Sequence, residues 1–187
     1  MSLVPAFEIG VWNAWIFMPY LFLLTIFAGK FKKGEDPGKT EIDALSKTGR
    51  RIFNLSFQVL FIAIIYSIFL PLKLGTLWFY AGLPIALIGL VTLTIVMINF
   101  TAIPWGKPIT KGLYHYSRHP MYITIALFLL GVGIASASWL FLLLSIVFTI
   151  LNTFRAINEE RYCLQKYGNA YREYTKRTPK WLGMPKS

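Results

Sequence analysis

Five long apolar stretches occupy most of this chain and restrict the folds it can adopt. They cover residues 11–28, 52–70, 77–100, 120–135 and 139–156. An α-helix rises 1.5 Å per residue, so a run of about 20 residues crosses a bilayer core about 30 Å thick. Hydrophobic residues make up 56% of the chain, above the share in ordinary soluble domains. The sequence therefore predicts an all-α, polytopic integral membrane protein with about five transmembrane helices, in a single domain over residues 1–187.

The connections between the apolar stretches differ in length and composition. Residues 29–51 and 101–119 are long and polar, whereas residues 136–138 leave room only for a tight helical hairpin. A short surface helix is expected from Lys39, and an amphipathic, cytoplasmic helix interrupted at Gly168 is expected after residue 157. Glycines inside the third and fourth stretches allow helices to approach closely. They are Gly82, Gly89, Gly131 and Gly133.

The basic residues indicate the orientation in the membrane. Of 19 Lys and Arg residues, seven lie in 29–51, three in 101–119 and eight from residue 155 onward. With five spans, these three segments fall on one side, which the positive-inside rule assigns to the cytoplasm. The N-terminus is therefore expected outside and the C-terminus inside.

Composition also limits the partners that this chain is expected to have. The net charge is +11, and the basic residues flank the apolar runs. Binding to anionic lipids therefore explains the positive charge better than binding to nucleic acid does. The one cysteine, Cys163, can form neither an internal disulfide nor a zinc site, and no metal is expected. No basic residue precedes the first apolar run, which is therefore expected to be retained and not cleaved as a secretory signal. Oligomeric state cannot be inferred from the sequence.

Two polar clusters flank the last two apolar stretches. The first is residues 112–122, where a loop enters a helix at Pro120, and where free N–H groups beside Arg118 suit a carboxylate or phosphate. The second consists of Arg155, Asn158, Glu159 and Glu160. Arg155 and Glu159 are four residues apart, so they are expected to share a helix face and to pair. A helical hairpin brings both clusters to the same membrane face. The alternatives are that Arg118 and His119 only anchor a helix at the interface, and that the two Glu residues mark a solvated helix exit.

These clusters, taken with the tail, carry a family resemblance. The residues that carry it, in order, are Gly112, Tyr114, Arg118, His119, Pro120, Met121, Tyr122, Arg155, Glu159, Glu160, Tyr167, Gly168, Tyr171, Tyr174 and Pro179. The pattern resembles the isoprenylcysteine carboxyl methyltransferase family and the related phospholipid methyltransferases, over about residues 99–183. The resemblance implies a methyltransferase that uses S-adenosylmethionine and a lipidic or prenylated acceptor.

The resemblance also implies roles for individual residues. Arg155 matches the acceptor-binding position and, with Arg118, is a catalytic candidate. Asn99 lies where a further polar cofactor contact is expected. Gly106 stands where the family often has histidine, which affects the loop contacts but not the class. The residues implied in cofactor binding are Gly106, Lys107, Pro108, Ile109, Tyr114, His119, Pro120, Met121, Tyr122, Glu159 and Glu160.

The chemistry of these residues agrees with methyl transfer. Aromatic faces such as those of Tyr114, Tyr116 and Tyr122 stabilise a sulfonium cation, and Arg155 can orient an anionic acceptor. An ionised acceptor needs no general base, whereas an amine would need one, with His119 or Glu160 as candidates. The tail tyrosines can equally form an interfacial aromatic belt.

Three alternatives remain open from the sequence. The acceptor can be the amine of a phospholipid instead of a prenylcysteine carboxylate. Membrane sterol reductases, which use a nicotinamide cofactor, resemble this fold in their C-terminal half but would be expected to have more spans. A non-catalytic lipid-binding scaffold would use the basic loops without any methyl donor.

Overall fold

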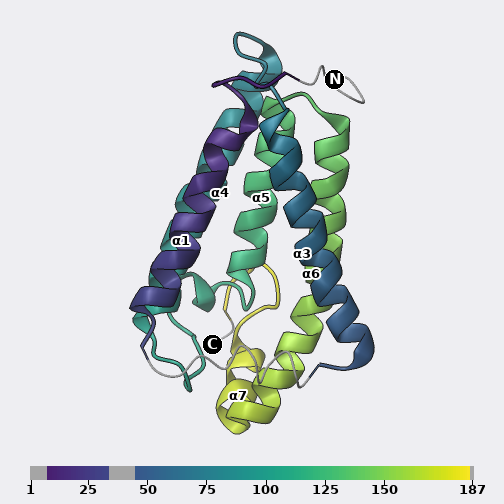
Figure 1. The fold of residues 1–187 in the computed structure, drawn as a ribbon. Coiled ribbons are helices and arrows are strands. Elements are labelled where there is room, and N and C mark those ends of the chain that lie inside the picture. The colour runs from purple at the N-terminus through teal and green to yellow at the C-terminus, as the bar shows by residue number, and fades with distance from the viewer. Residues whose placement is uncertain (1–7, 34–44, 186–187) are drawn as a thin grey trace.

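The computed structural model in Figure 1 describes residues 8–33 and 45–185 and contains no strand within these ranges. Two 3₁₀ turns, η1 and η2, cover Ala14–Phe17 and Gly112–His115. The helices are α1 (Met18–Phe31), α3 (Lys47–Ile68), α4 (Leu77–Ala102), α5 (Pro120–Ala135), α6 (Trp139–Tyr167) and α7 (Asn169–Arg177). The predicted all-α class is confirmed. The short helix expected from Lys39 would start outside the described residues.

Four helical segments are long and apolar enough to cross a membrane: residues 14–31, 47–68, 77–102 and 139–167. The fifth predicted span, α5, has 16 residues and falls among the shorter apolar helices. At 1.5 Å per residue it is about 24 Å long, less than a typical bilayer core. The polytopic membrane class is confirmed, and the described residues contain four candidate spans and one shorter apolar helix.

The first helix begins later than its apolar stretch predicts. Asn13 is buried and its side-chain amide donates a 2.7 Å hydrogen bond to the carbonyl of Ile68. The chain beside it pairs with the turn after α3, since Ala14 N–H donates to Leu70 O at 2.8 Å. The side-chain bond of Asn13 and the backbone bond of Ala14 keep residues 11–13 from being helical, so α1 starts only after the 3₁₀ turn.

Two other helices run beyond their apolar stretches. The α3 helix begins at Lys47 instead of residue 52, because the Ser46 hydroxyl accepts a 3.1 Å hydrogen bond from Gly49 N–H and caps the helix. The α6 helix continues through the charged segment to Tyr167 instead of ending at residue 156. It ends at Gly168, whose φ of +55° favours glycine.

Small residues bring α4 and α5 into direct backbone contact. A Cβ on Gly82 would lie 2.2 Å from Ala135 N, and one on Gly131 would lie 2.2 Å from Ala86 N. Such separations leave no room for any side chain at either glycine. The close approach expected from the glycines is therefore confirmed for this helix pair.

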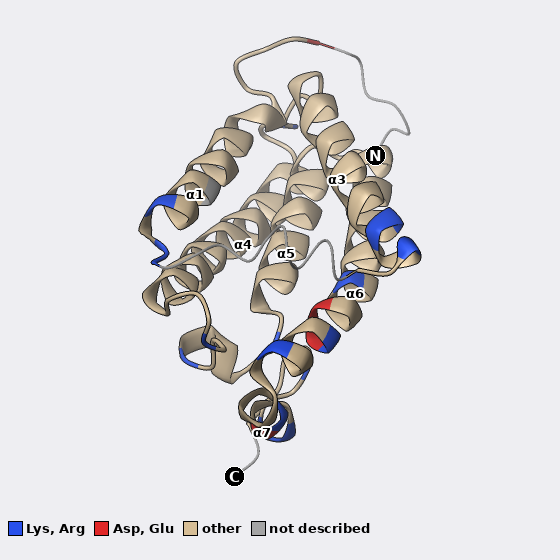
Figure 2. Cartoon of the chain, turned by 60° about the horizontal axis from the view of Figure 1, so that its bottom comes forward, with Lys and Arg blue, Asp and Glu red and all other residues tan. Residues whose placement is uncertain are grey.

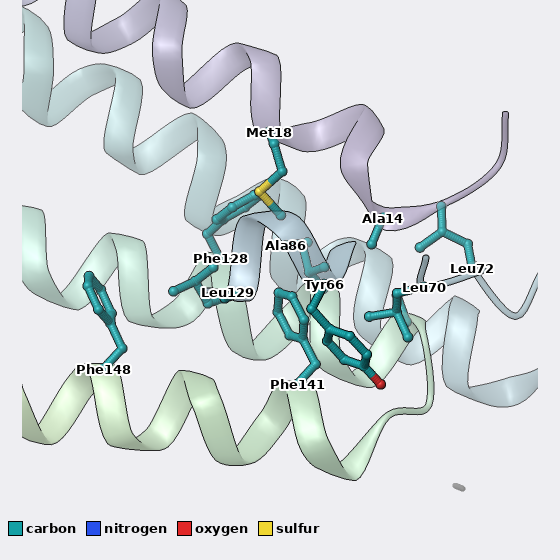
Figure 3. Packing of buried hydrophobic residues seen from close by; sticks show 13 residues of the cluster. Ala14, Met18, Tyr66, Leu70, Leu72, Ala86, Phe128, Leu129, Phe141 and Phe148 are labelled. Atoms are coloured by element: carbon teal, nitrogen blue, oxygen red, sulfur yellow. The ribbon is translucent and has the colours of Figure 1, made fainter. Parts of the chain in front are cut away.

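A large buried apolar cluster, which includes Ala14, joins the helices toward the end that carries the N-terminal segment (Figure 3). There Phe128 of α5, Phe141 of α6 and Tyr66 of α3 are buried together with Met18 of α1 and Leu70. The connection of residues 103–119 and helix α7 lie at the opposite end of the bundle (Figure 1), where Lys and Arg positions also gather (Figure 2). The fold thus separates a packed end from a polar, charged end.

Candidate active site

A cavity of about 360 Å³ lies at the polar end of the bundle. Its walls come from the ends of α1 and α4, the start of α3, the connection before α5, the first turn of α5, the last turns of α6, and α7. The lining residues are Lys32, Phe53, Phe100, Trp105, Lys107, Pro108, Ile109, Tyr114, Arg118, His119, Pro120, Met121, Tyr122, Arg155, Glu159, Tyr162, Cys163, Tyr167, Tyr171 and Tyr174. Its size falls in the range of small-molecule sites.

His119 is the residue at which the polar connection becomes helix α5. It is the N-cap, with Pro120 at the first helical position, where a missing N–H leaves no bond unmade. The backbone N–H of His119 donates to the Ser117 hydroxyl at 3.1 Å, which fixes the turn. Only 4% of His119 is exposed, so its ring is held by protein on most sides.

The His119 ring lies between two carboxylates from α6. Its Nε2 is 3.1 Å from Glu160 Oε1, and its Nδ1 is 3.6 Å from Glu159 Oε2. Burial of the imidazole opposes protonation, but hydrogen bonds and the negative charges of both Glu residues outweigh it and raise the pKa of His119 above its usual 6.5. The predicted meeting of the two polar clusters is confirmed by these contacts.

The two adjacent glutamates point to different neighbours. Glu159 lines the cavity and accepts a 2.9 Å hydrogen bond from the Tyr122 hydroxyl. Glu160 lies outside the lining and pairs with Arg118 at 3.2 Å and Lys180 at 3.5 Å. Successive helix positions face about 100° apart, which accounts for the split. Glu159 therefore faces the cavity, whereas Glu160 pairs with basic side chains behind the cavity wall.

The guanidinium of Arg155 packs against aromatic rings and does not pair with Glu159, one helical turn away. Its Nη1 donates to Ser56 Oγ at 3.2 Å and to Asn152 Oδ1 at 3.1 Å. Its guanidinium carbon lies 4.7, 5.3 and 5.6 Å from the ring centroids of Phe53, Phe57 and Tyr122. The predicted ion pair between Arg155 and Glu159 is not formed, although both residues line the cavity.

A smaller cavity of about 30 Å³ adjoins the first between α3 and α6. Phe53, Tyr122, Arg155 and Glu159 line both cavities. Arg155 thus lies where the two cavities meet, together with Phe53 of α3 and Glu159 of α6.

The tyrosines of the tail line the cavity and also bind the connection before α5. The Tyr174 hydroxyl donates a 2.6 Å hydrogen bond to the Tyr114 carbonyl. Burial, and secondarily the charge of Glu159, raises the pKa of Tyr114 far above its usual value, so this phenol stays neutral. The sequence left open whether the tail tyrosines form an interfacial aromatic belt or contact a ligand. In the structure these residues, Tyr162, Tyr167, Tyr171 and Tyr174, line the cavity.

The structure brings most of the residues implied by the resemblance to one cavity, although not all. Gly106 and Glu160 are outside the lining, and Gly106 is exposed at a φ of +90°. Asn99 packs against Gly112, where a Cβ would lie 2.3 Å from its Nδ2. Asn99 therefore supports the loop from behind and does not line the cavity.

Sequence reasoning missed several lining residues, of which Lys32 is the least expected. It is 7% exposed, and its Nζ donates a 2.6 Å hydrogen bond to Phe100 O. The Nζ also lies 3.5 Å from the ring centroid of Phe100 and 4.5 Å from that of Trp105. Lys32 lies among other basic residues in the sequence, and that position does not indicate burial. The sequence also gave no indication of four other lining residues, because they lie within apolar or interfacial segments: Phe53, Phe100, Trp105 and Cys163.

Comparisons with known proteins point to one class. A family profile described as phospholipid methyltransferase matches residues 74–170, just over half of the chain. A protein-S-isoprenylcysteine O-methyltransferase of Dictyostelium discoideum is 28% identical over 156 residues, which cover 71% of this chain and 60% of that protein. One of Schizosaccharomyces pombe is 32% identical over 72 residues, which cover 38% and 30%. The alignments thus span less than two thirds of either relative.

Proposed function

Because the chain belongs to the phospholipid methyltransferase family, we propose that it transfers a methyl group from S-adenosylmethionine to a lipidic acceptor. The acceptor proposed first is the carboxylate of an isoprenylated cysteine. The names of both relatives specify that substrate. The single observation that carries the choice is the guanidinium of Arg155, held by Ser56 and Asn152 at the meeting of the two cavities.

The cavity lining suits the methyl donor. When bound, S-adenosylmethionine supplies an electrophilic methyl group on a positively charged sulfur. Tyrosine faces attract such a cation, and Glu159 can accept hydrogen bonds from an ammonium or from hydroxyls. Arg118 lines the cavity, and its buried Nε has no hydrogen-bond partner among the described residues. A carboxylate of the ligand would satisfy that donor.

The acceptor side combines charge recognition with apolar contact. Arg155 can hold a carboxylate through two N–H groups in one plane, which orients the attacking oxygen. Phe53 and Phe57 flank the guanidinium and offer apolar surface to an isoprenoid chain. Methyl transfer is an in-line displacement, so the protein mainly has to align donor and acceptor and exclude water. A carboxylate is already ionised at neutral pH, and no residue has to remove a proton from it.

A second candidate acceptor is the amine of a phospholipid headgroup, which the description of the matching family favours. An amine attacks only as its neutral form, so a nearby group must take a proton. His119 lines the cavity and lies 3.1 Å from Glu160 behind the wall, so His119, backed by Glu160, is the candidate to take that proton. In this case Arg155 would bind the lipid phosphate.

The two acceptors are distinguished by the bond that forms. Protein in liposomes is supplied with methyl-labelled S-adenosylmethionine and either a farnesylated cysteine or phosphatidylethanolamine. A carboxyl methyl ester releases labelled methanol in mild base, whereas an N-methyl group does not. Base-labile label on the farnesylated cysteine, lost in Arg155→Gln, is the expected result. Label that enters only phosphatidylethanolamine and resists base would replace the first acceptor by the second.

The charge pattern supports a cytoplasmic location for the site. Lys and Arg gather at the end of the bundle where the cavity lies (Figure 2). On the positive-inside rule this end faces the cytoplasm and the N-terminus lies outside. Labelling of single cysteines in intact cells with a membrane-impermeant maleimide tests the orientation. A cysteine at Arg172 should stay unlabelled until the membrane is opened.

A further inference from the structure

The last described residues turn back from α7 and return to the start of α5 (Figure 1). We call residues 178–185 the C-terminal strap. Arg118 N–H donates to Pro179 O at 3.0 Å, and Gly183 N–H donates to Tyr116 O at 3.1 Å. These two backbone bonds fix the strap to the residues just before the first turn of α5.

The strap lies where the apolar part of the bundle is shortest. Helix α5 has 16 residues, whereas α6 has 29 and continues well past this level. Residues 116–118, to which the strap is bonded, directly precede the start of α5. Irregular backbone is tolerated near a bilayer only where its polar groups have partners in the protein. The two hydrogen bonds to residues 116–118 supply such partners.

The side chains of the strap sort by polarity. Lys180 turns toward the protein, where its Nζ is 3.5 Å from Glu160 Oε2. Trp181 is 36% exposed, with its ring 5.7 Å from the His119 ring. Leu182 and Met184 are 78% and 84% exposed. Large apolar side chains this exposed beside a Trp and a Lys are typical of membrane interfaces.

We infer that the C-terminal strap is an interfacial anchor, with Leu182 and Met184 inserted into the bilayer where headgroups meet acyl chains. Two observations favour lipid over a protein partner. The strap is bonded to Tyr116 and Arg118, which directly precede α5, so its exposed apolar side chains lie at the end of a bundle of apolar, membrane-spanning helices. Its charged group, Lys180, is turned inward to Glu160, which leaves an uncharged outer face. This inference does not depend on the reaction or on its acceptor.

The anchor has a consequence for the site. The strap carries Lys180 against Glu160 and Trp181 against His119, so the wall behind the cavity is attached to a segment in contact with lipid. The membrane surface thereby helps to hold the residues that position His119.

Depth measurement by electron paramagnetic resonance tests the anchor. Nitroxide labels are attached to Leu182→Cys and, separately, Met184→Cys in a Cys163→Ser background, with the protein in liposomes. Leu143→Cys, on α6 and 56% exposed, is the control for lipid, and Arg172→Cys on α7 is the control for water. Circular dichroism and gel filtration confirm that each variant is folded.

The expected result is preferential contact with oxygen, which concentrates in the bilayer. The ratio of oxygen to water-soluble nickel accessibility at 182 and 184 should be several-fold higher than at 172 and approach that at 143. Nickel accessibility equal to that at 172 would place the strap in water and overturn the inference. Protection from both reagents would also overturn it, because another protein surface would then cover these side chains.

Discussion

The Tyr122 hydroxyl donates a 2.9 Å hydrogen bond to Glu159 Oε2 and thereby ties the first turn of α5 to the end of α6. The two residues lie 37 positions apart in the chain. Both also line the cavity, so the bond fixes the carboxylate that faces the cavity. Any account of donor binding at this site depends on that orientation.

Replacing Tyr122 by Phe should therefore weaken donor binding while leaving the fold intact. A hydrogen bond to a charged group contributes about 1.5–3 kcal/mol, so affinity for S-adenosylmethionine should fall about tenfold or more. Calorimetry in detergent measures it. Tyr116→Phe is the matched control, since Tyr116 is exposed and outside the lining. Equal affinities for Tyr122→Phe and wild type would contradict a role for this bond.

Stability should fall as the pH rises above neutral, because of His119. Its pKa is raised in the folded protein, since the two Glu residues outweigh the effect of burial. The folded state thus binds this proton more tightly than the unfolded state. The contribution is fully present below the unfolded pKa of about 6.5 and is lost as pH rises through the folded pKa.

Thermal unfolding of wild type and His119→Asn over about pH 6 to 9 measures this contribution. The decline in melting temperature with rising pH should be steeper in wild type than in the variant. Identical slopes would show that His119 is not the group responsible.

A methyl group at Gly131 should destabilise the bundle. A Cβ there would lie 2.2 Å from Ala86 N, and a backbone atom cannot move aside without shifting α4 against α5. Overpacking of this kind costs about 1–3 kcal/mol, which thermal unfolding of Gly131→Ala would detect. Gly29→Ala is the control, since nothing lies within 4 Å of a Cβ at that helical position. A Gly131→Ala variant as stable as Gly29→Ala would contradict the close packing.

Replacing Lys32 by Met should loosen the cavity wall that Phe100 and Trp105 form. A desolvated cation–π contact is worth about 2 kcal/mol, and the hydrogen bond to Phe100 O is lost as well. We expect a lower melting temperature and weaker donor binding. Lys30→Met removes the same charge from an exposed position of α1 and should change neither quantity. Similar behaviour of both variants would reduce the role of Lys32 to net charge.

Much of the fold followed from the sequence because apolar length alone defines membrane helices. Residues 136–138 predicted the α5–α6 hairpin, and the hairpin in turn predicted that the cluster around His119 would lie near the cluster of Glu159 and Glu160. The late start of α1 was not predictable, since Asn13 hydrogen-bonds Ile68, 55 positions away, and Ala14 hydrogen-bonds Leu70. Hydropathy reports the polarity of a segment but not the partners of a single polar side chain.

The site was predictable where its residues are close in sequence and missed where they are not. Residues 107–109, 114 and 118–122 flank one helix start, and a motif captures them. Lys32 reaches the same cavity through contacts with Phe100, 68 positions away, and nothing near Lys32 in the sequence indicates burial. The sequence also did not show that Glu159 and Glu160 face different neighbours. That difference depends on the rotation of helix α6 and on the strap residue Lys180, which pairs with Glu160.

The most direct test of the proposed methyl transfer is calorimetric binding of S-adenosylmethionine to the purified protein and to Glu159→Gln. Glu173→Gln serves as the control, because Glu173 lies on the exposed face of α7. The account predicts saturable binding by wild type and Glu173→Gln, and binding weakened at least about tenfold in Glu159→Gln. The absence of binding to folded wild-type protein would contradict it.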